Sequence, residues 1–390
     1  MESIRYLFRS NIRQYAMLIA LVVIMAFFQV TTGGILLVPM NVTNLVLQNA
    51  YVFILAIGMT LTIIAGGNID LSVGSLVAFI GALCGAFIVT MKMNTGLAIA
   101  LALIIGLLVG IWQGYWIAYV RIPAFIVTLA GMLVFRGLTV FMLKGLTLGP
   151  FTDSFQMISS GFVPDFLGAP GGSLNLTAIA AGIVVAALYV LSSLRGRIAR
   201  KRNGFENSSL PLFIIQIAAI GAVIMLIAFW LAAYKGLPII FIIIVALVAA
   251  YSFFTTRTVP GRYFYAMGGN EKAARLSGIN TNKILFAAYI SMGVLSAVAG
   301  IAFTSRLNAA SPQAGLNFEL DAIGACFIGG ASAYGGIGTI VGSIIGALVM
   351  GVLNNGMSIM GVGSDIQQVV KGLVLLLAVA FDVLSKKKAR

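Results

Sequence analysis

The sequence contains no histidine and very little charge. Charged residues make up 9% of its 390 residues, and Asp and Glu together number only 10. Without histidine, serine–histidine triads and histidine-bound metal centres are excluded. A soluble domain carries about 25% charged residues, because its surface has to be hydrated. The shortage of charge therefore indicates that most of this chain's surface faces something other than water.

Cysteine is also scarce. Cys84 and Cys326 are the only two, and each lies inside an apolar run, so we expect no disulfide framework. The formal net charge of +14 is compatible with nucleic-acid binding. However, the Lys and Arg residues stand between apolar runs, which favours a role in orienting a membrane protein. We predict no nucleic-acid partner.

Apolar residues are in excess, at 61% of the chain, and the mean hydropathy is +1.08. About 20 apolar residues cross the roughly 30 Å of hydrocarbon in a bilayer. The pattern predicts an all-α polytopic membrane protein, a single transmembrane domain over residues 1–390 with about 10–12 helices. The expected spans are 16–38, 44–65, 71–91, 96–118, 124–143, 175–194, 210–233, 237–256, 284–304, a short broken segment at 320–334, 338–357 and 366–384.

The cations gather in alternate loops. They are concentrated at the N-terminus (Arg5, Arg9 and Arg13), in the loops 195–209 and 257–283, and in the C-terminal tail. Cytoplasmic loops are enriched in Lys and Arg, so we predict that both termini and these two loops face the cytoplasm. The loop 145–174 is then the longest outer loop. Twelve crossings satisfy this topology if 320–334 crosses as a short broken helix.

Glycine-rich breaks interrupt the apolar pattern at 66–75 and 320–337. The first, Gly66-Gly67-Asn68-Ile69-Asp70-Leu71-Ser72, leaves no room for a water-exposed loop, and Asp70 or Ser72 is suited to capping the next helix. It is either a broken helix that lines a polar cavity or a short turn near the inner surface. The stretches 73–83 and 341–351 resemble each other after their breaks, which favours an internal duplication.

A short helix is predicted in the cytoplasmic loop 257–283. Asn270 can cap it, the acidic Glu271 suits its first turn, and Gly278 is a plausible stop. Ala273, Leu276 and Ile279 recur at helical spacing. A helix with so few large apolar residues adheres weakly to lipid. Docking against another protein is the better interpretation.

These motifs resemble one family. The stretch Gly269-Asn-Glu-Lys-Ala-Ala-Arg-Leu-Ser-Gly-Ile279 is similar to the coupling-loop motif of ATP-binding-cassette importer permeases. The stretches 65–75, 121–137, 318–339, 354–361 and 369–379 extend the resemblance to the monosaccharide branch, over nearly the whole chain. Asn68 departs from the pattern, which puts a role for its side chain in doubt. The resemblance implies an ATPase-coupling helix formed by Asn270, Glu271, Ala273, Ala274, Arg275 and Gly278.

The resemblance also implies the partners and the location. It implies a second copy of this chain, a cytoplasmic ATPase and an extracytoplasmic sugar-binding protein, in the lipid of a bacterial inner membrane. The chain contains no GxxxxGK[ST] phosphate loop, so ATP and Mg²⁺ belong to the ATPase and we expect no cofactor and no enzymatic activity in this chain. The implied substrate is an aldopentose or an aldohexose.

Polar and aromatic residues in the spans are candidates for the translocation pathway or its gate. They are Asp70, Ser72, Phe125, Asn354 and Asn355. Hydrogen bonds between helices and anchoring at the membrane interface are the competing interpretations. Arg136 is costly to bury and needs a partner or the outer interface. Lys371 is expected to pair with Asp365 or to reach a headgroup.

Two other classes of function fit the sequence less well. A secondary carrier for a neutral solute needs an ion or proton site, for which only Asp70, Glu319 and Asp321 are candidates, and it leaves the cytoplasmic helix unexplained. An intramembrane enzyme needs acid and base groups at the membrane surface, which the missing histidine and sparse outer carboxylates disfavour.

Overall fold

The computed structural model describes residues 12–168, 172–205 and 209–387, with the side chains of residues 17–384 inside those ranges. The predicted N-terminal cations Arg5 and Arg9 lie outside these residues, as do residues 206–208 of the predicted loop 195–209. The chain forms two compact units. The larger comprises residues up to Leu36, Leu45–Ser160 and from Ile240 onwards, and the smaller comprises Leu37–Asn44 and Gly161–Ile239.

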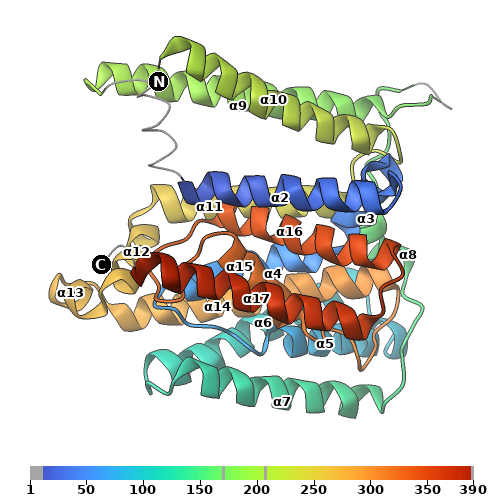
Figure 1. Ribbon diagram of the computed structural model, residues 1–390. Helices are drawn as coiled ribbons and strands as arrows, with labels where there is room; N and C mark the ends of the chain where they lie inside the picture. Colours follow the sequence, from blue (N-terminus) through green and yellow to red (C-terminus); the bar gives the residue numbers. More distant parts are fainter. Residues whose placement is uncertain (1–11, 169–171, 206–208, 388–390) are drawn as a thin grey trace. The chain divides into compact units, whose positions relative to one another are not determined.

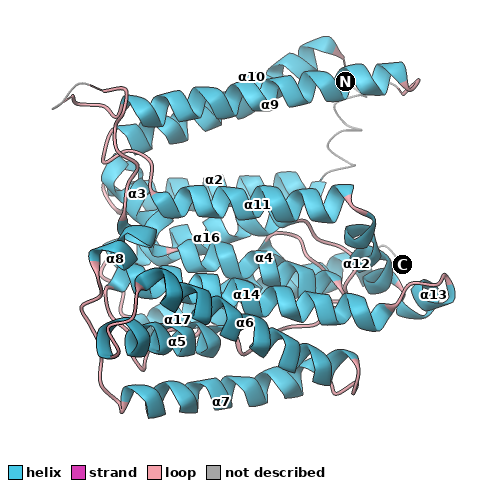
Figure 2. Ribbon diagram, turned by 180° about the vertical axis from the view of Figure 1, so that it is seen from behind, coloured by secondary structure: helices cyan, strands magenta, loops and turns pink. Residues whose placement is uncertain are grey.

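The described residues are almost entirely helical, as predicted, and their only β contacts are isolated bridges (Figures 1 and 2). The helices are α2 (Ile12–Thr31), the 3₁₀ helix η1 (Ile35–Leu37), α3 (Pro39–Gln48), α4 (Ala50–Ile64), α5 (Val73–Cys84), the π-helix η2 (Gly85–Thr90), α6 (Thr95–Ala118), α7 (Ala124–Leu143), α8 (Asp153–Ser160), α9 (Leu176–Arg202), α10 (Leu210–Ala232), α11 (Ile239–Arg257), α12 (Val259–Gly269), α13 (Glu271–Leu276), α14 (Thr281–Leu307), α15 (Phe318–Ile328), α16 (Ile340–Ile359) and α17 (Ser364–Lys387).

Two helices form the centre of the larger unit. All 15 residues of α4 are buried, as expected for a helix that is apolar all round. The helix α14 packs along α4, α5 and α6. A Cβ atom added to Gly293 of α14 would lie 2.4 Å from the carbonyl oxygen of Gly106, and one added to Gly110 would lie 2.7 Å from the carbonyl oxygen of Tyr289. Glycine therefore lets α6 and α14 approach backbone to backbone.

Nine helices of the described residues are long and apolar enough to cross a membrane. The pair α3 and α4, bent by 46°, passes the same test only when taken together and would make ten. The predicted segment at 320–334 contains α15, whose 11 residues extend about 16 Å. That is half of the hydrocarbon thickness, so α15 cannot cross by itself. The short broken segment is confirmed, and a twelfth crossing there would need the chain after α15 as well as the helix itself.

The loops of the larger unit gather at its two ends. The turn between α6 and α7 meets the segment α12–α13, since Arg121 binds Glu271. The loop after α7 meets the loop after α14 through a bridge between Leu148 and Ala310. In both views α12 and α13 lie at one end of the helices and α8 lies at the other (Figures 1 and 2). These loops therefore lie at opposite ends of the larger unit, as the predicted alternation of inner and outer loops requires for this part of the chain.

The smaller unit is built on the helix pair α9 and α10. A Cβ atom on Gly182 would lie 2.4 Å from the Cβ of Ala228, so small residues set their approach. Asp165 accepts hydrogen bonds from the backbone of Leu176 (2.9 Å) and Thr177 (3.0 Å) at the start of α9. Slight desolvation raises the pKa of Asp165, but these bonds and that of the Thr177 hydroxyl outweigh it and lower the pKa to about 2.

One expected loop is shorter in the structure. The predicted cytoplasmic loop 195–209 begins inside a helix, because α9 continues to Arg202. Lys and Arg are good helix formers, and cations in the last turn interact favourably with the helix dipole. The helix therefore runs beyond the apolar part of its sequence.

Candidate functional site

The segment α12–α13 carries the short helix predicted from the sequence. The side chain of Asn270 accepts a hydrogen bond from the backbone of Ala273 at 3.0 Å, which caps α13. Gly278 ends the segment with φ +83°, a left-handed conformation that glycine adopts without strain. Asn280 then caps α14 through the backbone of Lys283, also at 3.0 Å. The predicted start and stop are confirmed.

The helix α13 presents one face outward and packs the other. Ala274 is 5% exposed, whereas the Leu276 side chain is 91% exposed. Ala273 and Arg275 are exposed as well. Ala274, expected to belong to the ATPase-coupling helix, is the buried residue of α13, so a larger side chain there would disturb the packing before it met any partner.

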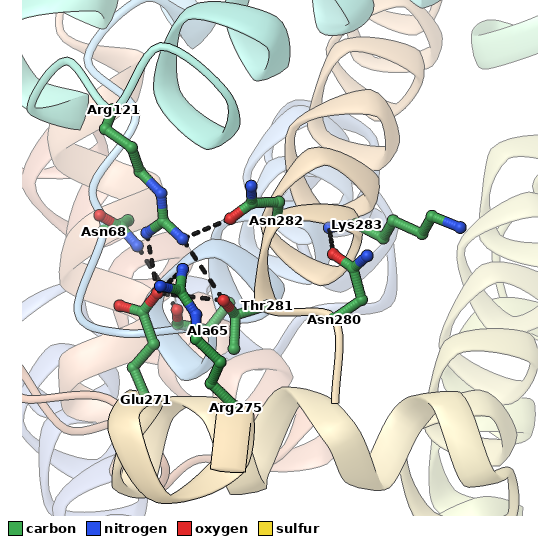
Figure 3. A network of polar contacts seen from close by, with 9 residues as sticks. All are labelled: Ala65, Asn68, Arg121, Glu271, Arg275, Asn280, Thr281, Asn282 and Lys283. Carbon is green, nitrogen blue, oxygen red and sulfur yellow. Dashed lines mark hydrogen bonds and ion pairs between the residues drawn. The ribbon is translucent and has the colours of Figure 1, made fainter. Parts of the chain in front are cut away.

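Arg121 ties this segment to the turn between α6 and α7 (Figure 3). Its guanidinium donates to Glu271 at 2.8 Å and to the Thr281 hydroxyl at 3.4 Å, and it also donates to the side chain of Asn282. The Thr281 hydroxyl donates to the same Glu271 oxygen at 3.1 Å. Arg275 completes the network at 3.8 Å from Glu271.

These contacts determine the charge of Glu271. Partial burial raises its pKa, but the hydrogen bond and charge of Arg121, with smaller contributions from Thr281 and Arg275, outweigh that and lower it below the usual range. A carboxylate whose pKa is lowered by folding stabilises the folded protein at every pH above its pKa in the unfolded chain. This stabilisation is lost as the pH falls through its pKa in the folded protein. The contact is therefore present throughout neutral and mildly acidic pH.

The end of α12 meets both glycine-rich breaks of the sequence. We call the glycine junction the set Gly66, Gly67, Gly268, Gly335 and Gly336. The backbone of Gly336 donates to the Ile64 carbonyl at 2.9 Å, and a Cβ atom on Gly268 would lie 1.8 Å from that oxygen. The Tyr265 hydroxyl of α12 donates to the Gly338 carbonyl at 3.0 Å. The end of α12 and the two glycine-rich breaks are thus in contact through their backbones, and a side chain at these glycines would separate them.

The candidate pathway residues at the first break are buried and use their hydrogen bonds internally. Asp70 and Ser72 are 2% and 0% exposed. Asp70 accepts from the Ser72 backbone at 2.8 Å and from its hydroxyl at 2.7 Å. Gln113 of α6 donates to the same hydroxyl at 2.7 Å. Asp70 therefore fixes Ser72, the residue before α5, rather than capping an amide within the helix, and Ser72 joins the start of α5 to α6.

The other candidate pathway residues lie elsewhere. Asn354 and Asn355 are on α16, where the Asn355 amide is 3.5 Å from Gln48 and the Asn354 side-chain oxygen is buried without a hydrogen-bond partner among the described residues. Phe125, at the start of α7, is 59% exposed. These three residues thus lie on other elements than Asp70 and Ser72, and a role of the five in the pathway stays a prediction.

A buried ion pair connects α15 to α17. The Lys371 ammonium lies 3.0 Å from Asp321, whose side chain is 1% exposed. The Tyr51 hydroxyl donates to the same carboxylate at 2.8 Å. The predicted pairing of Lys371 with Asp365 is therefore wrong, since the partner is a residue far away in the sequence. Arg136 donates to the carbonyls of Pro312 (2.9 Å) and Ala314 (2.7 Å), so the partner it was expected to need is present.

Comparison with known proteins decides the family. Residues 41–379 match the family described as branched-chain amino acid transport system / permease component. The chain is 40% identical to the xylose transport system permease protein XylH of Escherichia coli (strain K12) over 380 residues, 97% of this chain and 94% of that one. The chain belongs to this permease family. The predicted resemblance to ATP-binding-cassette importer permeases is thereby confirmed.

Two further relatives also match 97% of the permease. The XylH protein of Haemophilus influenzae (strain ATCC 51907 / DSM 11121 / KW20 / Rd) is 40% identical over 97% of this permease and 98% of its own length. The ribose import permease protein RbsC of Escherichia coli (strain K12) is 35% identical over 97% of this permease and 96% of its own length. No solved structure matches the permease. A bacterial inner-membrane location and a multi-pass topology follow.

Sequence reasoning missed two features of the permease. In the sequence Arg121 is one more cation between two apolar runs, whereas its neighbours in the structure are Glu271, Thr281 and Asn282. The only available signal was one acidic residue in a basic loop, which needs a cation near it. For the pair Asp321 and Lys371, the signal was a cation and a carboxylate that each stand inside an apolar stretch, since such charges pair with one another.

Proposed function

We propose that the permease is the membrane-spanning subunit of an ATP-driven importer of a monosaccharide, with an aldopentose as the first candidate. The full-length similarity to proteins named as xylose and ribose permeases carries this proposal. A partner subunit hydrolyses ATP, since the sequence has no phosphate loop, and an extracytoplasmic sugar-binding protein delivers the substrate. Two copies of the permease form the pathway. A secondary carrier is disfavoured because, of its three candidate residues, Asp321 is paired with Lys371 and Asp70 accepts hydrogen bonds from Ser72, which leaves only Glu319.

The outward face of α13 is the proposed docking site for the ATPase. Leu276 and Ala273 form its exposed apolar part, and the exposed cations Lys272 and Arg275 lie on the same short helix. A leucine side chain that is 91% exposed on a segment between two helices is suited to insertion into a groove of a partner. Its caps at Asn270 and Gly278 define where this short helix begins and ends.

The proposed orientation has a direct test. A cysteine introduced at Ser277, in a background without Cys84 and Cys326, should stay unlabelled by an impermeant maleimide in intact cells, because the α12–α13 end faces the cytoplasm. A cysteine at the exposed Thr152, beside α8, should be labelled. Permeabilised cells provide the control in which both sites react. Labelling of Ser277→Cys from outside would reverse the topology.

Association with the ATPase tests the docking site. We expect Leu276→Asp to reduce co-purification of the ATPase at least tenfold, which is about 1.4 kcal/mol, because it places a carboxylate in an apolar contact. Uptake of the sugar in proteoliposomes should fall with it. The control is Leu146→Asp, since Leu146 is also exposed but lies after α7 at the opposite end. Normal association and uptake by Leu276→Asp would contradict the docking site, and uptake by the permease without the ATPase would contradict the mechanism.

A further inference from the structure

Arg121 occupies a conformation that an arginine rarely adopts. Its φ is +67°, in the left-handed region where a side chain is strained and glycine is preferred. Strained residues persist where the surroundings fix them, and they cluster at functional positions. At this turn the whole side chain is used, because both terminal nitrogens of the guanidinium donate hydrogen bonds.

The bonds of Arg121 reach two different elements. Glu271 is the first residue of α13, and Thr281 and Asn282 are the first two residues of α14. Arg121 therefore joins the first residue of α13 and the first two residues of α14 to the turn between α6 and α7 (Figure 3). An arginine can do this because its planar fork presents several donors in fixed directions, which a lysine does not.

The helices α6 and α14, which both have an end near Arg121, are in contact further along their length. The helix α14 packs against α6 through Gly106, Gly110 and Gly293 without intervening side chains. Gln113 of α6 holds Ser72 at the start of α5. A displacement of α13 is passed to α5, α6 and α14 together if α13 is held to them. The hydrogen bonds of Arg121 hold the start of α13 to the start of α14 and to the turn between α6 and α7.

We propose that Arg121 is a positioning residue that couples ATP hydrolysis to transport, because it makes α13 and the α6–α7 turn move as one body. This inference rests on the proposed docking of the ATPase on α13. Arg121 itself does not form the docking face. Its carboxylate partner is partly exposed (40%), and exposed ion pairs add little to stability. Its loss should therefore leave the permease folded and the ATPase bound.

The test is the number of sugar molecules imported per ATP in proteoliposomes that contain the permease, its ATPase and its sugar-binding protein. In Arg121→Gln we expect ATPase co-purification and basal hydrolysis within twofold of the unaltered complex, with at least a tenfold lower sugar-to-ATP ratio. The matched control is Lys283→Gln, which removes the same charge from the first turn of α14, where the side chain points away from Arg121 (Figure 3). It should transport normally.

A charge exchange separates coupling from simple packing. Arg121→Glu and Glu271→Lys should each lose coupling, and the double variant should regain at least threefold in the sugar-to-ATP ratio over either one. An unchanged ratio in Arg121→Gln overturns the inference, as does loss of ATPase association as large as that of Leu276→Asp. If Leu276→Asp keeps the ATPase bound while Arg121→Gln loses coupling, the docking face is wrong and the role of Arg121 stands.

Discussion

Replacing Gly268 with alanine should strongly reduce sugar uptake. The added Cβ would lie 1.8 Å from the Ile64 carbonyl oxygen and 2.4 Å from the backbone nitrogen of Gly336, and neither is a flexible side chain that can move aside. The end of α12 would have to move away from both breaks, which opens the glycine junction. Overpacking of this kind costs about 1–3 kcal/mol. We expect uptake to fall more than tenfold.

The neighbouring glycine provides the control. A Cβ on Gly269 would meet nothing within 4 Å, and alanine suits a helix better than glycine, so Gly269→Ala should transport normally. Uptake, ATP hydrolysis and the melting temperature of both purified complexes should be measured together. If Gly268→Ala behaves like Gly269→Ala, the close approach of the three backbone segments has no role in transport.

Replacing Lys371 with methionine should strongly destabilise the folded protein. The change leaves the Asp321 carboxylate, 1% exposed, without its cation and with only the Tyr51 hydroxyl. Removing one partner of a buried ion pair costs about 3–5 kcal/mol, and an intramembrane charge without a partner is costly. We expect a lower yield of monodisperse protein and a lower melting temperature in detergent.

The double variant Asp321→Asn/Lys371→Met should recover most of that loss, because it removes both charges together. Lys283→Met is the matched control, since it removes an exposed cation from α14 and should leave the melting temperature unchanged. A stability of Lys371→Met equal to this control would show that Asp321 finds another partner. A double variant as unstable as the single one would show that the pair acts through packing.

The helices were predicted best where local signals mark their ends. The expected span 124–143 coincides with α7 (Ala124–Leu143), because Pro123 limits its start. The span 96–118 is close to α6 (Thr95–Ala118), which Asn94 caps through Gly96 and Leu97. The extension of α9 to Arg202 was missed because hydropathy marks where a bilayer ends, and a helix can continue into water.

In the candidate site, too, features set by neighbouring residues were predicted and features set by tertiary contacts were not. Asn270, Glu271 and Gly278 were assigned correctly to the start and stop of α13, because caps depend on residues a few positions apart. The burial of Ala274 was not predicted, since the inward face of a six-residue helix is set by α12 and α14 rather than by its own sequence. Lys371 pairs with Asp321, and Arg121 pairs with Glu271. The partners in each pair are far apart in the sequence, so no local pattern predicts that they meet.

The backbone-to-backbone packing of α6 and α14 has a consequence for how the protein is made. The helix α6 ends at Ala118 and α14 begins at Thr281, roughly 160 residues later, and a ribosome adds about 5–20 residues per second. The glycine face of α6 therefore waits about 10–30 seconds in the bilayer before its partner is synthesised. During that interval the same face is open to any other helix with small residues. Substitutions at Gly106 or Gly110 should thus affect the yield of inserted protein as much as the stability of the finished fold.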